Sequence, residues 1–347
     1  MLILAINPGA TSLKAAIFED EKELKRTVVR FDTAVLESFQ TRAEQNAYRL
    51  SAVTDFLKEE GYSAEQLDCV VARGGALKSV RSGAYYINEK MVEDSNHANG
   101  PHGLGIGVAY GMMHPQGKPA LIYDAVTADE WLPIAKVTGI KGVAKKAAQH
   151  TLNTRRVAIE VARQMGKTYD EADLIVSHIG GGSDSVCFQH GRIIDAIGYH
   201  DLGFTPERCG PIRFDTLREL LKTMTMDDMQ ALQNGKGGLV SHFGTADIRK
   251  VQEMIDAGDQ QAELVLHAMA YRIAQTIGAC AVSMHGRVDA IVITGGGAYS
   301  DTLYNWIEEA VGFIAPVKRF PGELELEALA QGALRVRRGE ETAREYT

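Results

Sequence analysis

The chain has 347 residues, of which 45% are hydrophobic and 24% are charged, and its formal net charge is −8. This length predicts about two domains, and the composition is that of an ordinary globular protein. The acidic balance and the absence of a long basic run argue against a nucleic-acid partner, because such binding depends on Lys and Arg side chains that neutralise phosphates. A nucleotide ligand remains compatible, since it needs only a few local donors.

Cysteine usage and hydropathy indicate whether the protein binds zinc and where in the cell it is located. The four cysteines include no CxxC pair, which argues against a zinc site. The apolar start of the chain, residues 1–6, lacks a basic lead and is too short for a signal peptide or a membrane span. We therefore expect a cytoplasmic protein without a membrane partner.

The first half of the chain predicts a β-hairpin followed by two strands that end in polar residues. A turn at 7–12 joins the strands of the hairpin, and the later strands end at Arg73 and Asp124. Buried strands are predicted at residues 1–6, 13–18, 67–72 and 120–123. Helices are predicted at residues 103–113 and 143–165, and the second of these links the two halves.

The second half repeats this order. A glycine-rich turn at 178–183 joins two strands, and a later strand ends in Gly295, Gly296 and Gly297. Strands are predicted at residues 174–177, 185–189, 192–196, 288–294 and 314–317. Helices are predicted at residues 214–233, 246–285, 300–310 and 325–338.

The repeated order predicts two related α/β domains, each with one hairpin turn and one glycine loop at a strand end. Ligands of α/β sheets bind at the carboxyl ends of strands, so two such domains would hold a nucleotide in a cleft between them. The predicted boundaries are 1–148 for the first domain and 149–325 for the second. Residues 326–347 are expected to complete the first domain.

The first candidate phosphate site is the turn of the N-terminal hairpin. Its backbone N–H groups and the hydroxyls of Thr11 and Ser12 suit phosphate oxygens, and Lys14 is a natural charge partner. Asn7 could hold phosphate or a water molecule bound to Mg²⁺. The alternative is a plain β-turn, since Asn-Pro and Gly favour turns. The spacing of a Walker A loop is absent.

Two further glycine clusters are candidate nucleotide contacts. Gly180, Gly181 and Gly182 let the backbone approach a ligand closely, with His178 at the preceding strand end. Gly295, Gly296 and Gly297 close a strand and precede a helix, an arrangement typical of nucleotide contacts. A flexible loop is the alternative for the first cluster, and the second is informative mainly as part of the repeat.

Single polar residues at element ends supply candidate catalytic groups. Arg73, Asp124, His150 and Arg208 are of the types that a phosphoryl-transfer site needs, namely cations for the spreading negative charge and a group that holds metal. Each one alone is more often a surface charge or a satisfied polar group. The same holds for the run of acidic residues Glu323, Glu325 and Glu327.

These motifs resemble those of the acetate/butyrate kinase family, and of its butyrate kinase branch most closely. The resemblance runs through nearly the whole chain. It is carried by INPGATSLKAAIFEDEK, VVARGGALKSVRSG, VSHIGGGSDS, FTPERCG, NGKGGLVSHFGTADIRKV, VDAIVITGGGAYS and PGELELEALAQGALRVRRGEE. It implies a duplicated ribonuclease-H-like fold, as in actin and sugar kinases, and ATP-dependent, reversible phosphorylation of a short-chain carboxylate to an acyl phosphate. It also implies ATP/ADP and Mg²⁺ as cofactors and a homodimer or higher homo-oligomer.

The resemblance also implies roles for individual residues. The catalytic group would be Arg73, Asp124, His150, His178 and Arg208. The nucleotide and phosphate contacts would be Asn7, Thr11, Ser12, Lys14, Gly180, Gly181, Gly182, Asp247, Ile248, Arg249, Gly295, Gly296 and Gly297. The metal would be held by Asn7 and Glu325, although Glu323 and Glu327 leave the register of this glutamate open.

Three departures from the family pattern keep alternatives open. Ala10 removes a turn hydroxyl, Gln149 replaces the usual Phe, and Asp184 places a carboxylate beside the second phosphate loop. A charge ~4 Å from phosphate would repel it by about 4 kcal/mol at an effective dielectric constant near 20, unless a cation offsets it. One alternative is a paralogue that binds ATP with weak activity. Another is a kinase for a hydroxyl acceptor with Asp124 as base, although the two arginines favour a carboxylate.

Overall fold

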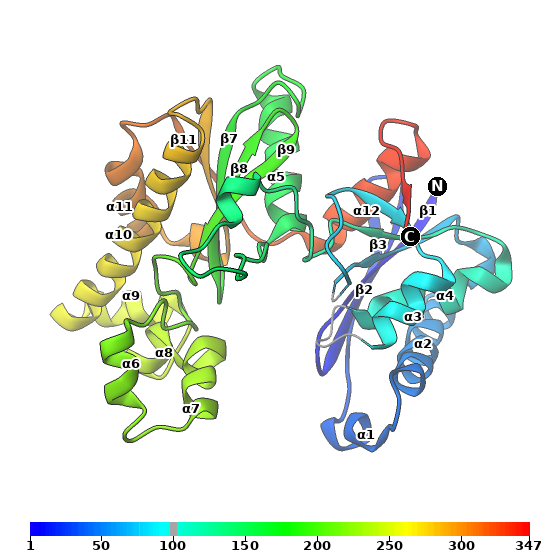
Figure 1. Cartoon of the computed structure of the whole chain (residues 1–347). Coiled ribbons are helices and arrows are strands. Elements are labelled where there is room, and N and C mark those ends of the chain that lie inside the picture. Colours follow the sequence, from blue (N-terminus) through cyan, green and yellow to red (C-terminus); the bar gives the residue numbers. More distant parts are fainter. Residues whose placement is uncertain (76, 98–102) are drawn as a thin grey trace. The chain divides into compact units, whose positions relative to one another are not determined.

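The computed structural model describes residues 1–75, 77–97 and 103–347, and it divides into two compact units (Figure 1). The first unit comprises Met1–Asp129 and Leu324–Thr347, and the second comprises Glu130–Glu323. The C-terminal segment Leu324–Thr347 thus belongs to the first unit. Residues 130–148, which the predicted boundary placed in the first domain, lie in the second unit. There the Leu132 N–H donates to the Ile194 carbonyl (2.9 Å).

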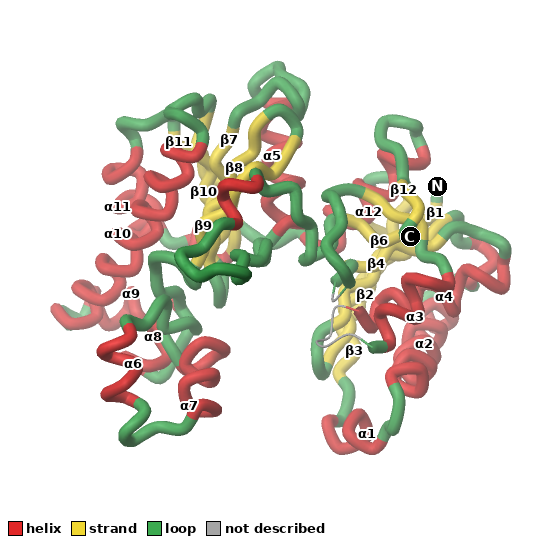
Figure 2. The backbone as a smooth tube through the Cα atoms, viewed as in Figure 1, coloured by secondary structure: helices red, strands yellow, loops and turns green. Residues whose placement is uncertain are grey.

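The first unit is built on a seven-stranded mixed sheet with the strand order β12-β5-β6-β4-β1-β2-β3 (Figure 2). Strands β1, β4 and β6 are parallel, whereas β2 and β3 form an antiparallel extension. The strands are β1 (Leu2–Pro8), β2 (Ser12–Glu19), β3 (Lys22–Arg30), β4 (Cys69–Arg73), β5 (Ala84–Tyr86), β6 (Ala120–Tyr123) and β12 (Arg344–Glu345). The carboxyl ends of β1, β4 and β6 therefore meet at one edge of the sheet.

Helices cover this sheet because alternate residues of its central strands are buried on opposite faces. Leu4 and Ile6 of β1 belong to a core that includes Val53 of α2 and Ile106 of α4. Helix α12 packs against β1, β4 and β6, and its Gly332 lies so close to Tyr123 that a Cβ would be 2.5 Å from the ring. The α-helices of this unit are α1 (Thr33–Ser38), α2 (Arg42–Glu59), α3 (Glu89–Asn96), α4 (Leu104–Met113) and α12 (Glu325–Arg337).

The second unit contains a five-stranded sheet with the order β11-β10-β7-β8-β9. Val176 of β7 packs with α5 on one face, whereas Ile175 packs with α10 on the other, as expected for a strand buried on both sides. The strands are β7 (Leu174–Ile179), β8 (Ser183–Gln189), β9 (Arg192–Gly198), β10 (Ala290–Gly295) and β11 (Val317–Pro321). The α-helices are α5 (Thr151–Gln164), α6 (Phe214–Leu220), α7 (Met226–Ala231), α8 (Gly238–Phe243), α9 (Ile248–Asp256), α10 (Gln260–Ser283) and α11 (Asp301–Val311).

The two sheets share one topology. The order β3-β2-β1-β4-β6 of the first matches β9-β8-β7-β10-β11 of the second, with an antiparallel hairpin next to parallel strands in both. The predicted duplication of an α/β core is therefore confirmed. None of the described helices is long and apolar enough to cross a membrane.

Several predicted element boundaries are wrong. The helix predicted at 143–165 begins only at Thr151, because the preceding residues form an extended segment in which the Lys145 N–H donates to the Lys136 carbonyl. The helix predicted at 214–233 is divided by a new start at Thr225, whose side chain caps α7. The helix predicted at 246–285 is interrupted at Gly258, which has φ +91°, and Asp259 then caps α10.

Other segments were missed or shifted. Strand β3 (KELKRTVVR) was missed because it is charged and half exposed, and its pairing with β2 rather than an apolar pattern makes it a strand. The strand predicted at 314–317 lies at β11. The end of the chain, for which no strand was predicted, forms β12 beside β5, and the buried Tyr346 hydroxyl donates to Asp94 (2.8 Å).

Candidate active site

The predicted site residues fall into two groups, one in each unit, and the first group begins at the turn between β1 and β2. The Gly9 N–H donates to the Ser12 carbonyl (2.8 Å), which closes the turn. Thr11 is exposed and Ser12 is half-buried. Asn7 and Lys14 are opposite partners across the hairpin, so their side chains emerge on the same face of the sheet. The turn therefore presents both hydroxyls, an amide and an ammonium group close together.

Arg49 of α2 supports this turn from behind, and sequence reasoning missed it. The side chain is fully buried and donates to the carbonyls of Ala10 (2.6 Å) and Ser12 (3.1 Å). Its guanidinium also lies over the ring of Phe31, 4.5 Å from the centroid. Because the turn carbonyls point toward Arg49, they are held by a cation instead of facing a bound anion.

Glu325 joins two of the predicted residues at the carboxyl edge of the first sheet. Its Oε1 accepts a hydrogen bond from Arg73 (2.5 Å), and its Oε2 accepts one from the Asn7 amide (2.5 Å). Glu327 pairs instead with Arg26, and Glu323 lies in the second unit. Of the three acids, Glu325 is therefore the one that contacts Asn7. Arg73 Nε is buried and has no hydrogen-bond partner among the described residues.

Asp124 follows β6 at the same sheet edge. It comes directly after Tyr123, which pairs with Arg73 between β4 and β6. It is buried, its backbone is left-handed at φ +46°, and its Oδ1 accepts from the Gly83 N–H (2.7 Å). Non-glycine residues in this conformation persist where the surroundings impose it, and they are common at functional sites. Asp124 is therefore a rigidly held carboxylate close to Arg73.

The second group begins at His178, the residue of β7 that precedes the second turn. His178 is buried, and the Asn153 amide of α5 donates to its Nδ1 (3.0 Å), which leaves the ring proton on Nε2. His178 Nε2 lies 3.1 Å from Glu323 Oε1. Burial, followed by the charge of His150, lowers the pKa of His178, so the ring is neutral at pH 7. Sequence reasoning missed Asn153, although its position three residues after His150 places both on one side of α5.

His150 stands at the start of α5 and stacks on His178, with the ring centroids 4.0 Å apart. Its ring Nδ1 is hydrogen-bonded to Asp184 of β8, and its backbone N–H also donates to Asp184 (3.2 Å). The two predicted histidines are thus adjacent, and the unexpected carboxylate lies directly against one of them.

Three glycines form the turn between β7 and β8 because side chains occupy the space that a Cβ would need. A Cβ on Gly180 would lie 2.9 Å from His178 Nε2, and one on Gly181 would lie 2.7 Å from a Glu207 carboxylate oxygen. None of the three has a left-handed φ. Close approach, rather than unusual backbone conformation, therefore explains this cluster.

Arg208 lies on the segment that packs against this turn. The Thr205 hydroxyl donates to the Gly181 carbonyl and accepts from the Arg208 N–H (3.2 Å), which ties the segment to the turn. The guanidinium contacts Glu207 and lies over Tyr199, 5.8 Å from the ring centroid. Its Nε is buried without a hydrogen-bond partner among the described residues. Thr205 was not predicted.

The third glycine cluster lies at the end of β10. Gly295 has φ +85°, and a Cβ there would lie 2.4 Å from the Ile179 carbonyl oxygen. A Cβ on Gly297 would lie 2.4 Å from the Ile179 side chain, whereas Gly296 is exposed with nothing near it. Two of the three glycines therefore pack against the start of the second turn, and Gly296 is left as the accessible one.

Comparisons with known proteins show the family to which the chain belongs. A family model described as the acetokinase family matches residues 135–313. A curated relative named probable butyrate kinase 2, from Caldanaerobacter subterraneus subsp. tengcongensis, is 39% identical over 99% of both chains. The chain belongs to the acetokinase family.

Solved structures show the same fold at lower sequence identity. An acetate kinase from Porphyromonas gingivalis superimposes with a TM-score of 0.78 at 19% identity and covers 96% of this chain and 98% of its own. A propionate kinase from Francisella tularensis subsp. tularensis gives a TM-score of 0.75 at 17% identity, covering 95% and 98%. The predicted fold class, the duplicated ribonuclease-H-like fold of actin and sugar kinases, is confirmed for this chain.

The residues expected to hold Mg²⁺ in this acetokinase have suitable chemistry. Asn7 and Glu325 provide amide and carboxylate oxygens, the donors that Mg²⁺ prefers, and they are already adjacent. Among the described residues, no group of three or more His, Cys, Asp or Glu side chains forms a metal cage. This sparse set fits Mg²⁺, which usually takes one or two carboxylates and completes its shell with water and substrate phosphates.

The predicted adenosine-side residues have a local structural role. Asp247 caps α9 by accepting from the Arg249 N–H (3.0 Å), and the Arg249 side chain also pairs with it (2.8 Å). Ile248 packs against the core of the second unit. These contacts explain the spacing of the three residues, and their part in nucleotide binding stays a prediction.

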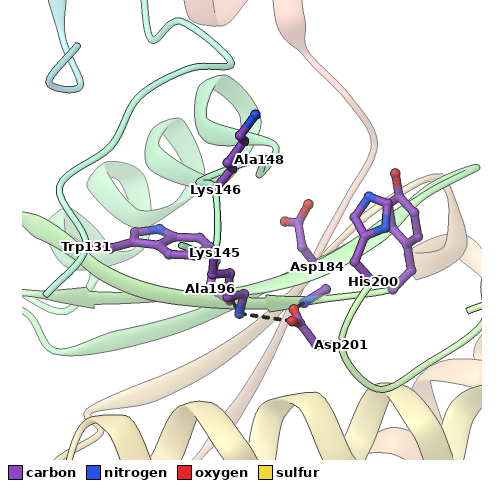
Figure 3. A pocket seen from close by; sticks show the side chains of 10 residues that line it. Trp131, Lys145, Lys146, Ala148, Asp184, Ala196, His200 and Asp201 are labelled. Atoms are coloured by element: carbon purple, nitrogen blue, oxygen red, sulfur yellow. Dashed lines mark hydrogen bonds and ion pairs between the residues drawn. The ribbon is translucent and has the colours of Figure 1, made fainter. Parts of the chain in front are cut away.

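A cavity of about 270 Å³ opens beside Asp184 in the second unit (Figure 3). Trp131 and Tyr199 supply aromatic walls, and Lys145 is tied to Asp201 by an ion pair of 3.1 Å. Asp184 also lines the cavity, and its Oδ1 is buried without a hydrogen-bond partner among the described residues. The Asp184 carboxylate thus contacts His150 and also lines this cavity.

Proposed function

We propose that this acetokinase-family chain transfers the terminal phosphoryl group of ATP to the carboxylate of a short-chain fatty acid the size of butyrate, giving ADP and an acyl phosphate. The observation that carries the acceptor class is the 39% identity, across nearly all of both chains, with a curated probable butyrate kinase. The reaction is reversible, since an acyl phosphate can return its phosphoryl group to ADP.

The proposed mechanism is direct in-line transfer. The acceptor carboxylate is already ionised at pH 7, so no general base is required. The main barrier is repulsion between two anions, which Arg73 and Arg208 would offset with guanidinium groups that have unused donors. His150 and His178 would supply further donors, and Asp124 would keep the site rigid.

Phosphate binding is assigned to the turns and the accessible glycine. Thr11, Ser12 and Lys14 would bind phosphate oxygens at the first turn, and the N–H groups of Gly180–Gly182 would do so at the second. Gly296 would contact the nucleotide, with Asp247, Ile248 and Arg249 on the adenosine side. Asn7 and Glu325 would hold Mg²⁺, which neutralises phosphate charge.

The acceptor is tested by measuring hydroxamate formation over a series of linear and branched acids. We expect butyrate and isobutyrate to show higher kcat/KM than acetate. A preference for acetate would overturn the butyrate assignment. Nucleotide binding without acyl phosphate formation from any acid in the series would favour the weakly active paralogue.

The mechanism is tested by Arg73→Ala and Arg208→Ala. Each should lower kcat about 100-fold or more, while nucleotide affinity changes little, because the lost charge acts mainly in the transition state. Lys should rescue neither, since it lacks the planar fork that grips a carboxylate. Arg163→Ala, at an exposed position of α5, is the control and should retain full activity. A folded Arg73→Ala protein with near-native turnover would refute the mechanism.

We also propose a homodimer or a multiple of one in the cytoplasm. Helix α10 carries three exposed apolar side chains, Leu264, Tyr271 and Val282, that a partner could cover. Analytical ultracentrifugation should show no monomer at micromolar concentration, and a pure monomer would contradict the assignment.

A further inference from the structure

Asp184 is a buried acid at a position where the family pattern has a small neutral residue. Only 5% of its side chain is exposed, and it lies opposite His178 in the β7–β8 ladder. A buried carboxylate without a partner is costly, because the lost hydration must be replaced by local charge or hydrogen bonds. The immediate question is therefore what stabilises this charge.

The answer lies at the start of α5. Asp184 Oδ2 accepts hydrogen bonds from both the backbone N–H and the ring Nδ1 of His150. These two contacts hold the end of the helix and the imidazole at once. Burial by itself would raise the pKa of Asp184, but the charge of His150 and its ring hydrogen bond outweigh burial and lower the pKa below its usual value. Asp184 is therefore ionised at neutral pH.

Two other described rings, those of His178 and Tyr199, lie close to His150. His178, stacked on it, is neutral because of burial and accepts a hydrogen bond from Asn153. Tyr199 approaches the same side of the turn as His150, since both would contact a Cβ on Gly182.

The remaining charged groups lie around neighbouring residues. Lys145, Lys146, His200 and Asp201 line the cavity next to Asp184, Arg208 lies over Tyr199, and Glu323 lies at His178 Nε2. Of these groups, Lys145 is paired with Asp201, and Arg208 contacts Glu207.

We propose that Asp184 is a positioning residue that binds protonated His150 as an ion pair, fixing both the orientation of the ring and its positive charge. This inference rests on the proposed function, in which His150 faces the transferring phosphoryl group. With this ion pair, Asp184 need not repel phosphate, as its charge alone would. The His150 charge offsets the carboxylate, so the pair presents no net negative charge to phosphate.

The direct test is a titration of the His150 ring by NMR in the full-length protein, with the resonance assigned through His150→Gln. Asp184→Asn keeps the side-chain shape and removes the charge. The His150 midpoint should fall by about 1–3 pH units, the usual effect of losing an opposite charge at this range. Should Asp184→Asn fail to fold, Asp184→Ser, which restores a small neutral residue, makes the same measurement possible. An unchanged midpoint in a folded variant would overturn the proposal.

Asp195→Asn is the matched control. Asp195 is also a buried acid of this sheet, on β9, but it accepts from the Ser283 hydroxyl (2.8 Å) instead of a histidine. Its replacement should leave the His150 midpoint at the native value. A shift as large as that of Asp184→Asn would show a general effect of lost negative charge and would also overturn the ion pair.

A second readout separates this proposal from the proposed function. In Asp184→Asn the alkaline limb of the kcat profile should move to lower pH by the same amount as the NMR midpoint. A shifted midpoint with an unshifted kcat profile would remove the link between the ion pair and catalysis. If the native enzyme proved inactive on every acid, the proposed function would fail, while the NMR titration would still decide whether Asp184 holds His150 protonated.

Discussion

The turn between β1 and β2 and the turn between β7 and β8 occupy equivalent places in the duplicated sheets, yet different contacts hold them. The first is supported from behind by the buried guanidinium of Arg49, which binds the Ala10 and Ser12 carbonyls. The second is supported by the segment that carries Arg208, since the Gly181 carbonyl accepts from the Thr205 hydroxyl and the Glu207 N–H. The shared sheet topology therefore does not determine which contacts stabilise each candidate phosphate-binding turn.

The comparison also explains the different sequences of the turns. The first turn keeps hydroxyl side chains because its support comes from α2 and leaves its outer side open. The second is all glycine because His178 and Glu207 occupy the space where Cβ atoms would lie. The following three changes test this difference, in order of decreasing expected effect.

Gly295→Ala should disrupt the support of the second turn. The new Cβ would lie 2.4 Å from the Ile179 carbonyl, and the backbone is left-handed there. We expect the unfolding free energy of the second unit to fall by about 3 kcal/mol or more, measured as a lower urea midpoint. Gly296→Ala is the matched control, because its Cβ would meet nothing within 4 Å. Equal midpoints for the two variants would argue against backbone packing as the support.

Arg49→Met should weaken the first turn without touching the second. The change removes charge-assisted hydrogen bonds to two carbonyls, partly compensated by lower desolvation, so we expect a loss of about 2 kcal/mol. ADP affinity, measured by calorimetry, should also fall because the N–H groups of the turn are no longer fixed. Arg163→Met, at a position where the side chain is 75% exposed, should change neither quantity. Native ADP affinity in a folded Arg49→Met protein would show that this support is not needed for binding.

Ala10→Ser should have the smallest effect and should act on binding alone. Ala10 is exposed at the tip of the first turn, so the added hydroxyl meets solvent in the free protein. One extra hydrogen bond to phosphate would contribute about 0.5–1.5 kcal/mol, or roughly a 2- to 10-fold gain in ADP affinity. The melting temperature should stay unchanged. A loss of affinity would mean that the tip of the turn does not face phosphate.

Sequence reasoning succeeded where local chemistry decides the structure. Buried apolar strands that end in glycine or polar residues were found because their residue types favour only that arrangement, as in β1, β7 and β10. It failed at β3, whose charged sequence becomes a strand only by pairing with β2. It also missed α2 and with it Arg49, because nothing local links a helix residue to a turn 39 positions away.

The candidate site shows the same division. Asn7, Arg73, His150 and His178 were predicted from motifs, but the contacts of Asn153 with His178 and of Glu325 with Arg73 were not. The family resemblance favoured Glu325, but Glu323 and Glu327 stayed open, since three alternating acids look alike in sequence. Its contact with Asn7 spans 318 positions and depends on where α12 begins against the sheet.

The sequence by itself thus determined the buried strands, the glycine turns between them and the duplicated order, because short-range sterics and hydrophobic burial suffice for these features. Only the tertiary structure decided which charges meet. It paired Glu325 with Arg73, placed Arg49 behind the first turn and set Asp184 against His150. The interaction between two charged groups depends on the distance between them in space, and that distance is set only once the helices have packed on their sheets.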